Sequence, residues 1–324
     1  MIPEHDTWRV LDASKIQEFM RCPRRYFYRY VLGWESSQTS VDLVFGSAWH
    51  EAMEVLLERG YSQSVVADAY LRFEAIYRSV LEPEMDLQNA PKIPSNAMRA
   101  LARYITFWAN DHQDYEVLHV EVAGSVLISD RKPLFFKIDA IMKEKSTGSI
   151  FALEHKTTGS LSPRWVNQWR QKFQLGVYTH ALYCLFDPDT VTGVTVNGVQ
   201  ITNPPQMKQD GTPYANSRDI EFKRVPVRLS RDRMADWLDT AEFYFDWIQS
   251  EHENLDMSSP DEPTLRAFPK CTESCGDFYG CPFIDYCTTY ANPLRVADSP
   301  PMGYTVNYWD PRTKQETAKE VMNL

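Results

Sequence analysis

The sequence predicts an α/β protein, in which a mixed sheet is sandwiched by helices and preceded by a mostly helical region. Three observations carry this prediction. Two apolar runs within 134–156 flank a polar, glycine-containing segment at 143–149, which is typical of a β-hairpin. Segments before residue 112 repeat their apolar residues at helical spacing, and β-branched runs return after residue 190.

Composition narrows the class of protein. The chain has 324 residues, of which 43% are hydrophobic and 13% aromatic, so it can bury a large core. Its 34 basic and 44 acidic residues give a net charge of −10, which argues against a general nucleic-acid coating protein. We see no apolar run long enough to cross a bilayer and no signal-peptide pattern, and therefore expect a cytoplasmic protein with no membrane contact.

The first predicted helix covers residues 13–33, with Ser14 as a plausible N-cap and Gly33 as a plausible end. Pro23 should kink it or begin a second helix. Its arginines are interspersed with aromatic residues. This pattern suits contact with a nucleic-acid strand, but it equally suits a helix that buries its aromatic rings and solvates its charges. The arginines are Arg21, Arg24, Arg25 and Arg29.

Residues 45–59 form a second predicted helix, which carries His50 at the edge of its apolar stripe. A single helical histidine is usually structural or solvated, although histidine is also a common metal ligand. Further helices are predicted at 62–80 and 95–108, separated by a loop at 81–94.

The predicted hairpin carries the strongest chemical signal. Strand alternation places Glu154 and Lys156 on one face at the end of the second strand, and the hairpin can bring Asp139 of the first strand beside them. Two carboxylates and an ammonium group are costly to gather in one place unless they bind something. Carboxylate oxygens suit Mg²⁺ or Mn²⁺, and a cation of this kind can face a phosphate.

The elements after the hairpin alternate in type. Residues 165–185 are predicted to be a helix with Gln174 and Tyr178 on one face. Strands follow at 191–201 and 220–228, the second at a sheet edge because Pro226 cannot donate a hydrogen bond. A long helix is expected at 229–251. Residues 293–324 contain several prolines and are expected to be a poorly anchored tail.

Six cysteines add a second possible metal site. Four fall within 17 residues near the C-terminus, and clustering of this kind in a cytosolic protein indicates metal rather than disulfides. Four cysteines in one block could hold a structural zinc ion, although their spacing is not that of common zinc modules. Cys184, in an apolar helical stretch, is expected to be a buried thiol. The others are Cys22, Cys271, Cys275, Cys281 and Cys287.

The motifs occur in a specific order: CPRRYFYRY, GSAWH, KIDAIM, LEHK, QLGVY and CPFIDYC. This ordered set resembles the RecB-like branch of the PD-(D/E)XK nuclease superfamily. It is most similar to iron–sulfur exonucleases typified by AddB and by CRISPR-associated and phage-encoded RecB-like nucleases. The resemblance covers roughly residues 13–290, and implies a restriction-endonuclease-like core. The family often has a glycine two residues before its aspartate, where this sequence has Lys137.

The resemblance implies a role for each matched residue. His50, Asp139, Glu154 and the backbone carbonyl of His155 would hold Mg²⁺ or Mn²⁺, and Lys156 would be the catalytic lysine. Gln174 and Tyr178 would be an accessory catalytic pair. Cys22 would join three C-terminal cysteines around a four-iron, four-sulfur (4Fe–4S) cluster. We expect these to be Cys275, Cys281 and Cys287, with Cys271 the competitor for the place of Cys275, since the spacing from Cys275 to Cys281 repeats in the next interval.

The implied function is a metal-dependent DNA nuclease, and more specifically an exonuclease, that acts in DNA repair or recombination or in a phage. Its partner would be single-stranded DNA or duplex ends, with the tail as a docking site for a partner protein. The alternative is a non-catalytic DNA-binding or scaffolding protein that keeps the nuclease fold and a structural zinc or iron–sulfur site. The expected single domain covers residues 1–292, with a helical region at about 13–112, a catalytic core at about 115–230 and a cluster segment at about 266–290.

Overall fold

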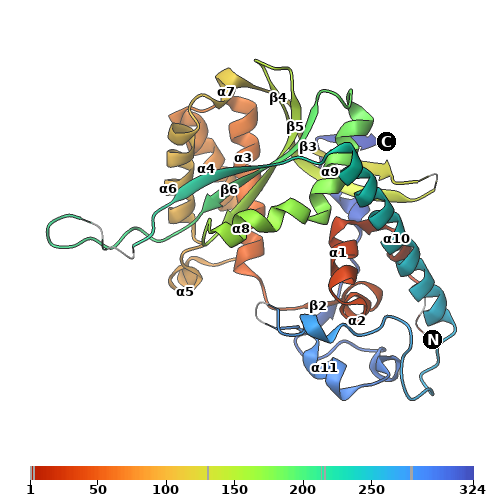
Figure 1. Ribbon diagram of the computed structural model, residues 1–324. Helices are drawn as coiled ribbons and strands as arrows, with labels where there is room; N and C mark the ends of the chain where they lie inside the picture. The colour runs from red at the N-terminus through yellow and green to blue at the C-terminus, as the bar shows by residue number, and fades with distance from the viewer. Residues whose placement is uncertain (1, 3, 130, 213, 215–216, 278–279) are drawn as a thin grey trace.

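The computed structural model describes residues 2, 4–129, 131–212, 214, 217–277 and 280–324. Its centre is a mixed sheet with the strand order β7-β6-β5-β4-β3-β9, in which β1 also pairs with β4 (Figure 1). The predicted α/β class with a central mixed sheet between helices is confirmed. The strands of this sheet are β1 (Leu11–Asp12), β3 (Tyr115–Leu127), β4 (Pro133–Glu144), β5 (Ile150–Thr158), β6 (Val191–Gln200), β7 (Glu221–Val227) and β9 (Glu320–Asn323).

The predicted hairpin is present as antiparallel β4 and β5, joined by a turn that includes Gly148 at φ +75°. β5 and β6 are parallel, whereas β6 and β7 are antiparallel. β7 lies at the sheet edge, as Pro226 predicted. β4 pairs with β5 only over 140–143, and β1 instead pairs with Leu134 and Phe135 at the other end of β4. The two hairpin strands therefore separate just before Asp139.

Helices cover both faces of the sheet (Figure 1). One face packs against α3 (Val41–Arg59), α4 (Gln63–Arg78) and α6 (Pro94–Phe107), whose apolar residues join Val199 of β6 and Ile201 just after it. The other face packs against α1 (Ala13–Arg21), α9 (Phe173–Leu185) and α10 (Arg231–Asp256) in the largest core. Short helices are α2 (Pro23–Tyr26), α5 (Asp86–Asn89), α7 (Asp111–Asp114), α8 (Pro163–Asn167) and α11 (Ile284–Thr289).

Two helix predictions need correction. The N-cap of α1 is Asp12, whose carboxylate accepts a hydrogen bond from the Lys15 amide, so Ser14 lies inside the helix. The single helix predicted at 165–185 is divided by a 3₁₀ turn at Gln168–Gln171 and by an extended Lys172. The division lets Trp165 pack tightly over Gly198 of β6 while α9 starts again at Phe173. Pro23 does begin a second helix, and Gly33 ends the segment at φ +68°.

The C-terminal residues are well anchored, so the expectation of a poorly anchored tail is wrong. β8 (Tyr304–Val306) pairs with β2 (Trp34–Ser36), and β9 pairs in parallel with β3. Trp309 and Lys314 both bind the buried Asp12 carboxylate, at 3.1 and 2.7 Å. The short strands carried too little apolar pattern to be predicted. Within the described residues, no helix has the length and apolar character that a membrane span requires.

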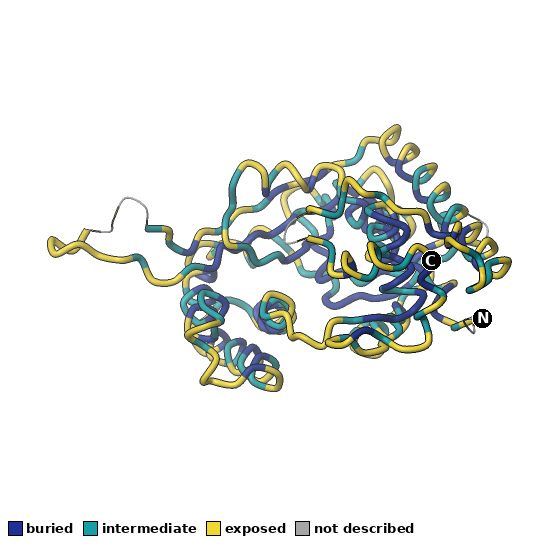
Figure 2. The backbone as a smooth tube through the Cα atoms, turned by 90° about the horizontal axis from the view of Figure 1, so that it is seen from below, coloured by how far each residue is buried: buried dark blue, intermediate teal, exposed yellow. Residues whose placement is uncertain are grey.

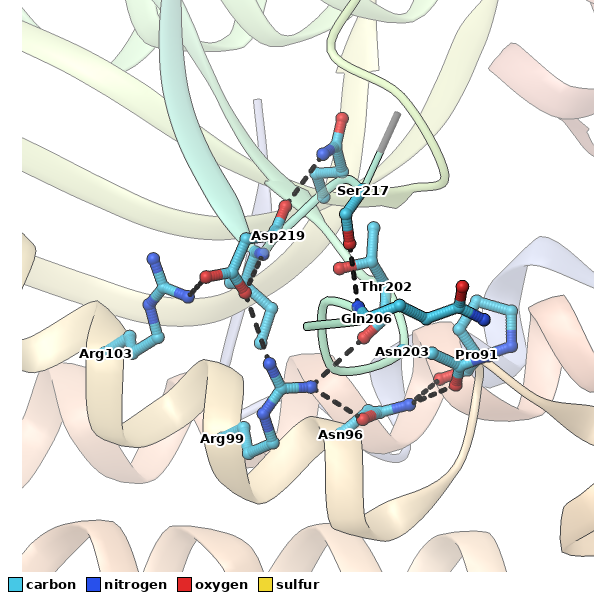
Figure 3. Close-up of polar contacts among 11 residues, drawn as sticks. Pro91, Asn96, Arg99, Arg103, Thr202, Asn203, Gln206, Ser217 and Asp219 are labelled. Carbon is cyan, nitrogen blue, oxygen red and sulfur yellow. Dashed lines mark hydrogen bonds and ion pairs between the residues drawn. The ribbon is translucent and has the colours of Figure 1, made fainter. Parts of the chain in front are cut away.

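The segment between β6 and β7 projects from the sheet, and most of its described residues are exposed (Figures 1 and 2). Its base is fastened to α6 by polar contacts (Figure 3). Asp219 forms ion pairs with Arg99 and Arg103 at 3.2 and 2.5 Å. Asn96 donates to the Asn203 side-chain oxygen at 3.0 Å. These contacts set the direction in which the projection leaves the sheet.

Candidate functional site

Asp139 lies where β4 and β5 separate. Its Oδ2 accepts a hydrogen bond from the His155 backbone amide at 2.7 Å, and its side chain is buried. Just past the last β4–β5 pair, the Asp139 side chain, and not the β4 backbone, binds the β5 backbone. The separation therefore converts the end of the hairpin into a polar site.

The apolar faces of β3 and β4 also change at this point. Val122 and Ile138 pack in the core beneath α9, whereas Val120 and Ala140 pack with Leu57 of α3. Ile138 and Ala140, which regular strand alternation would place on one face, therefore pack in different cores. The backbone of β3 is distorted at Glu121, whose φ is +50°, and this accompanies the change, because regular alternation would keep positions two apart on the same face.

His50 reaches the site from α3. Its Nδ1 lies 3.0 Å from Asp139 Oδ1. Burial lowers the pKa of His50, but the adjacent Asp139 carboxylate outweighs this and raises the pKa above its ordinary value. Conversely, burial opposes ionisation of Asp139, but His50 holds the pKa of this carboxyl group below its usual range. The charge on Asp139 is thus stabilised by groups that point at it.

Glu121 of β3 joins this pair and was missed by the sequence analysis. One ligand atom each from His50, Glu121 and Asp139 lies within 4.8 Å of the other two. Glu121 lies across from Asp139, because its neighbours Val120 and Val122 pair with Ala140 and Ile138. Its φ of +50° is uncommon for a residue other than glycine, and strained backbone of this kind clusters at functional sites. Burial and the Asp139 carboxylate raise the pKa of Glu121.

Glu154, Lys156, Gln174 and Tyr178 form the other half of the site. Glu154 Oε1 forms an ion pair with Lys156 Nζ and accepts a hydrogen bond from Gln174 Nε2 at 3.2 Å. The same Gln174 nitrogen lies 2.6 Å from the Tyr178 hydroxyl. The predicted shared face of Glu154 and Lys156, and that of Gln174 and Tyr178, are both present. Glu154 is not in the close group around Asp139.

The second oxygen of Glu154, Oε2, is buried and has no hydrogen-bond partner among the described residues. Burial and the Asp139 carboxylate raise the pKa of Glu154. Burial lowers the pKa of Lys156, but Glu154 reverses this effect and raises it. A buried carboxylate oxygen without a donor is costly, and a bound cation would satisfy it.

The His155 ring lies edge-to-face with the His50 ring, at a centroid distance of 6.1 Å, and binds Asn197, which in turn binds Tyr104 of α6. Its Nδ1 accepts from the Asn197 side-chain nitrogen at 2.9 Å, which assigns the proton to Nε2. Burial lowers the pKa of His155 to about 3, so the ring is neutral. The His155 backbone amide binds Asp139, and the role of the His155 carbonyl as a metal ligand stays a prediction.

Residues 11–288 match one protein family, described as the PD-(D/E)XK nuclease superfamily. The chain belongs to this superfamily. Its members are generally phosphodiesterases that use divalent metal ions, which indicates a metal-dependent nuclease with a nucleic-acid substrate. The close group of His50, Glu121 and Asp139 in this nuclease is a candidate site for such an ion.

Two further comparisons add little to the family assignment. A solved structure described as the crystal structure of SSO0001 is 14% identical to this nuclease, and the similarity covers 76% of this chain and 78% of that chain. The TM-score of 0.29 is too low to support an argument. No curated protein sequence matches the chain.

The second candidate site of the nuclease is a cavity of about 270 Å³ lined by five cysteines. Cys22 is the N-cap residue of α2, and the other four come from the segment 271–287. The Cys271 amide donates to Cys22 Sγ at 3.4 Å, across 249 positions of sequence.

Cys184 lies apart from the cavity. It is exposed, so the expectation of a buried thiol is wrong. Phe278 and Tyr279, within the predicted cluster segment, lie outside the described residues.

Arg24 belongs to the wall of this cavity and does not suit contact with DNA. It is 2% exposed, and its guanidinium group donates to the carbonyl oxygens of Phe268 and Leu265 at 2.9 and 2.8 Å. Contact with a nucleic-acid strand and exposure to solvent, the two interpretations of this arginine pattern, are both wrong for Arg24, because its side chain is inside the protein. Its Nη1 is buried without a hydrogen-bond partner among the described residues.

The other three arginines of this segment lie nearer the surface. Arg25 and Arg21 both form ion pairs with Glu18, the second at 3.6 Å. Arg29 binds Glu35 at 2.6 Å and the Asn307 carbonyl at 3.0 Å. A role of these arginines in binding phosphate remains a prediction.

Proposed function

We propose that this nuclease is a RecB-like DNA exonuclease that needs Mg²⁺ or Mn²⁺ and carries a 4Fe–4S cluster. The observation that carries the catalytic part is the convergence of His50, Asp139, Glu154 and Lys156 on one buried polar site. Two close pairs from three separate elements, His50 with Asp139 and Lys156 with Glu154, lie near enough that the Asp139 charge raises the pKa of Glu154. Glu154 Oε2 lacks a partner among the described residues.

The donor set fits a hard divalent cation. His50, Asp139, Glu154 and the His155 carbonyl would hold the ion, which matches the oxygen-rich sites with one or two carboxylates that Mg²⁺ prefers. Glu121, although close to His50 and Asp139, is already paired with Lys137. When bound, the ion would lower the pKa of a coordinated water and polarise the phosphate. A zinc site of the structural kind would instead use cysteine and histidine ligands.

The remaining side chains perform distinct tasks in this mechanism. Lys156, which Glu154 keeps protonated, orients the attacking water and offsets the negative charge that develops on the phosphate. Gln174 holds Glu154 Oε1 by a hydrogen bond and is itself positioned by Tyr178. The accessory pair therefore fixes the rotamer of Glu154 and so aims its Oε2.

The cysteine cavity supports a cluster more strongly than a zinc ion. Tetrahedral zinc with Zn–S bonds of about 2.3 Å brings its sulfur atoms to about 3.8 Å from one another. Among the residues that the structure describes, no three cysteine sulfurs lie within 4.8 Å of one another. A four-iron cluster is larger and holds its thiolates farther apart. Arg24 Nη1 adds a buried donor at the cavity wall for an anionic group.

A nuclease assay tests the catalytic proposal. Linear single-stranded, linear double-stranded and closed circular DNA are incubated with the purified protein and Mg²⁺, Mn²⁺ or EDTA. We expect metal-dependent loss of the linear substrates only, and no activity in Asp139→Ala or Glu154→Ala. Cleavage of the circle would exclude an exonuclease, and unchanged cleavage in EDTA would exclude the metal-dependent mechanism.

The wider context follows from the same proposal. A cytoplasmic enzyme that degrades DNA from its ends would act in DNA repair or recombination, or in the life cycle of a phage. Docking of a partner protein on residues 293–324 stays a prediction. This segment is not a free tail, because its strand β9 pairs with β3 of the sheet.

A further inference from the structure

A second lysine stands beside the candidate metal site. Lys137 Nζ of β4 lies 2.6 Å from Glu121 Oε2, and the Glu121 carboxylate is buried. Residues 121 and 137 are diagonal neighbours on paired strands, since Val122 pairs with Ile138. The ion pair is thus built into the sheet by its register.

The charges of the site are nearly balanced before any ion binds. Glu121 is paired with Lys137, and Glu154 is paired with Lys156. Asp139 has no lysine partner among the described contacts and faces His50. Three carboxylates and two ammonium groups leave one negative charge, which a single divalent ion more than offsets.

Without the Lys137 ammonium group, the Glu121 carboxylate would be free to act as the ligand of a second metal ion. In two-metal nuclease sites the ions lie about 3.5–4 Å apart and share carboxylates. A Glu121 ligand atom lies within 4.8 Å of one from Asp139, so the two carboxylates are close enough to face a shared cation site. The backbone also holds Glu121 in place, since its carbonyl accepts from the Lys319 amide of the C-terminal segment at 3.0 Å.

We propose that Lys137 limits the site to one divalent ion, because its ammonium group takes the place beside Glu121 that a second ion would fill. This inference rests on the proposed metal-dependent function. It extends that function by stating the number of ions and naming the residue that sets it. Lys137 is a positioning residue, which acts on the ion through Glu121.

Counting bound Mn²⁺ tests this inference. Equilibrium dialysis of the intact protein is followed by metal analysis for the wild type, Lys137→Gln, Lys132→Gln and Asp139→Asn. The Lys137→Gln change keeps a hydrogen-bond donor for Glu121 but removes the charge. Lys132 is the matched control, because it also pairs with carboxylates, at Glu242 and Asp246, on a different part of the surface.

We expect one tight Mn²⁺ in the wild type and in Lys132→Gln, two in Lys137→Gln and none in Asp139→Asn. One ion in both the wild type and Lys137→Gln overturns the role of Lys137 but leaves the proposed metal site intact. Two ions in the wild type also overturn it. If the wild type binds none, or if Asp139→Asn binds as the wild type does, the proposed metal site itself fails.

A measurement on the wild type alone covers the case in which Lys137→Gln does not fold. Electron paramagnetic resonance of protein saturated with Mn²⁺ distinguishes an isolated ion from two ions coupled at short distance. We expect the spectrum of an isolated ion. A coupled pair would refute the inference without any variant.

Discussion

Replacing Arg24 with methionine should destabilise the protein without any direct effect on DNA contacts. The Arg24 guanidinium group links the first helices to residues 265–268, more than 240 positions away, through hydrogen bonds to the Leu265 and Phe268 carbonyls. Hydrogen bonds to charged groups contribute about 1.5–3 kcal/mol each, so the loss of two predicts a cost of about 3–6 kcal/mol.

This cost can be converted to a melting temperature. An unfolding entropy of about 2.1 cal/mol/K per residue gives about 0.7 kcal/mol/K for the whole chain. The Arg24→Met variant should therefore melt about 4–9 °C below the wild type. Circular dichroism at 222 nm measures the shift.

Arg25→Met is the matched control. Arg25 lies in the same short helix, but its side chain is partly exposed and pairs only with Glu18 among the partners that the structure records for it. Its loss should cost less than about 1 kcal/mol. If Arg25 contacts a phosphate, the slope of log affinity against log salt should fall by about one unit.

A result in which Arg24→Met melts with the wild type but loses the salt-dependent part of DNA binding would refute this reasoning. It would mean that the carbonyl contacts contribute little and that Arg24 reaches DNA after all. The same pair of variants therefore separates a structural arginine from a binding one.

Four further predictions concern separate parts of the molecule. Lys156→Ala should lower the cleavage rate by about 10²–10⁴-fold at unchanged melting temperature, and full activity would exclude its catalytic role. Iron analysis should show loss of iron in Cys22→Ser and Cys275→Ser but not in Cys271→Ser; the reverse result for Cys22 and Cys271 would favour a zinc site within the C-terminal block. Burial lowers the pKa of His252 to about 4. Because the unfolded chain binds this proton near pH 6.5, stability should fall by about 3 kcal/mol as the pH drops from 6.5 to 4, and urea titrations of His252→Phe should lack this part of the loss. Gly124→Ala should displace β9, because its Cβ would lie 1.6 Å from the Met322 carbonyl oxygen; unchanged hydrogen exchange at residues 320–323 would contradict this.

The sequence predicted the parts of the site that follow from local periodicity. Strand alternation was enough to place Glu154 and Lys156 together, and the spacing of four residues was enough for Gln174 and Tyr178. His50 and Asp139 come from elements far apart in sequence, and only the order of motifs linked them before the structure brought them to 3.0 Å.

The residues that escaped prediction depend on long-range geometry. Glu121 lies in the site because β3 is distorted there, at a φ of +50° that no local pattern indicates. Arg24 looked like a surface arginine because its acceptors are carbonyl groups of a distant segment, which have no side-chain signature. β9 has only four residues, too few for a periodic pattern, and its pairing with β3 is decided by tertiary contacts.

The position of β9 has a consequence for how the chain is made. β3 is complete once residue 127 has been synthesised, but the strand that covers its free edge at 122–125 is not available until residue 323. At translation rates of about 5–20 residues per second, this edge stays open for about 10–40 s. An open strand edge is a template for pairing with other chains, so the nascent protein is most prone to aggregate during this interval and is then a suitable client for chaperones.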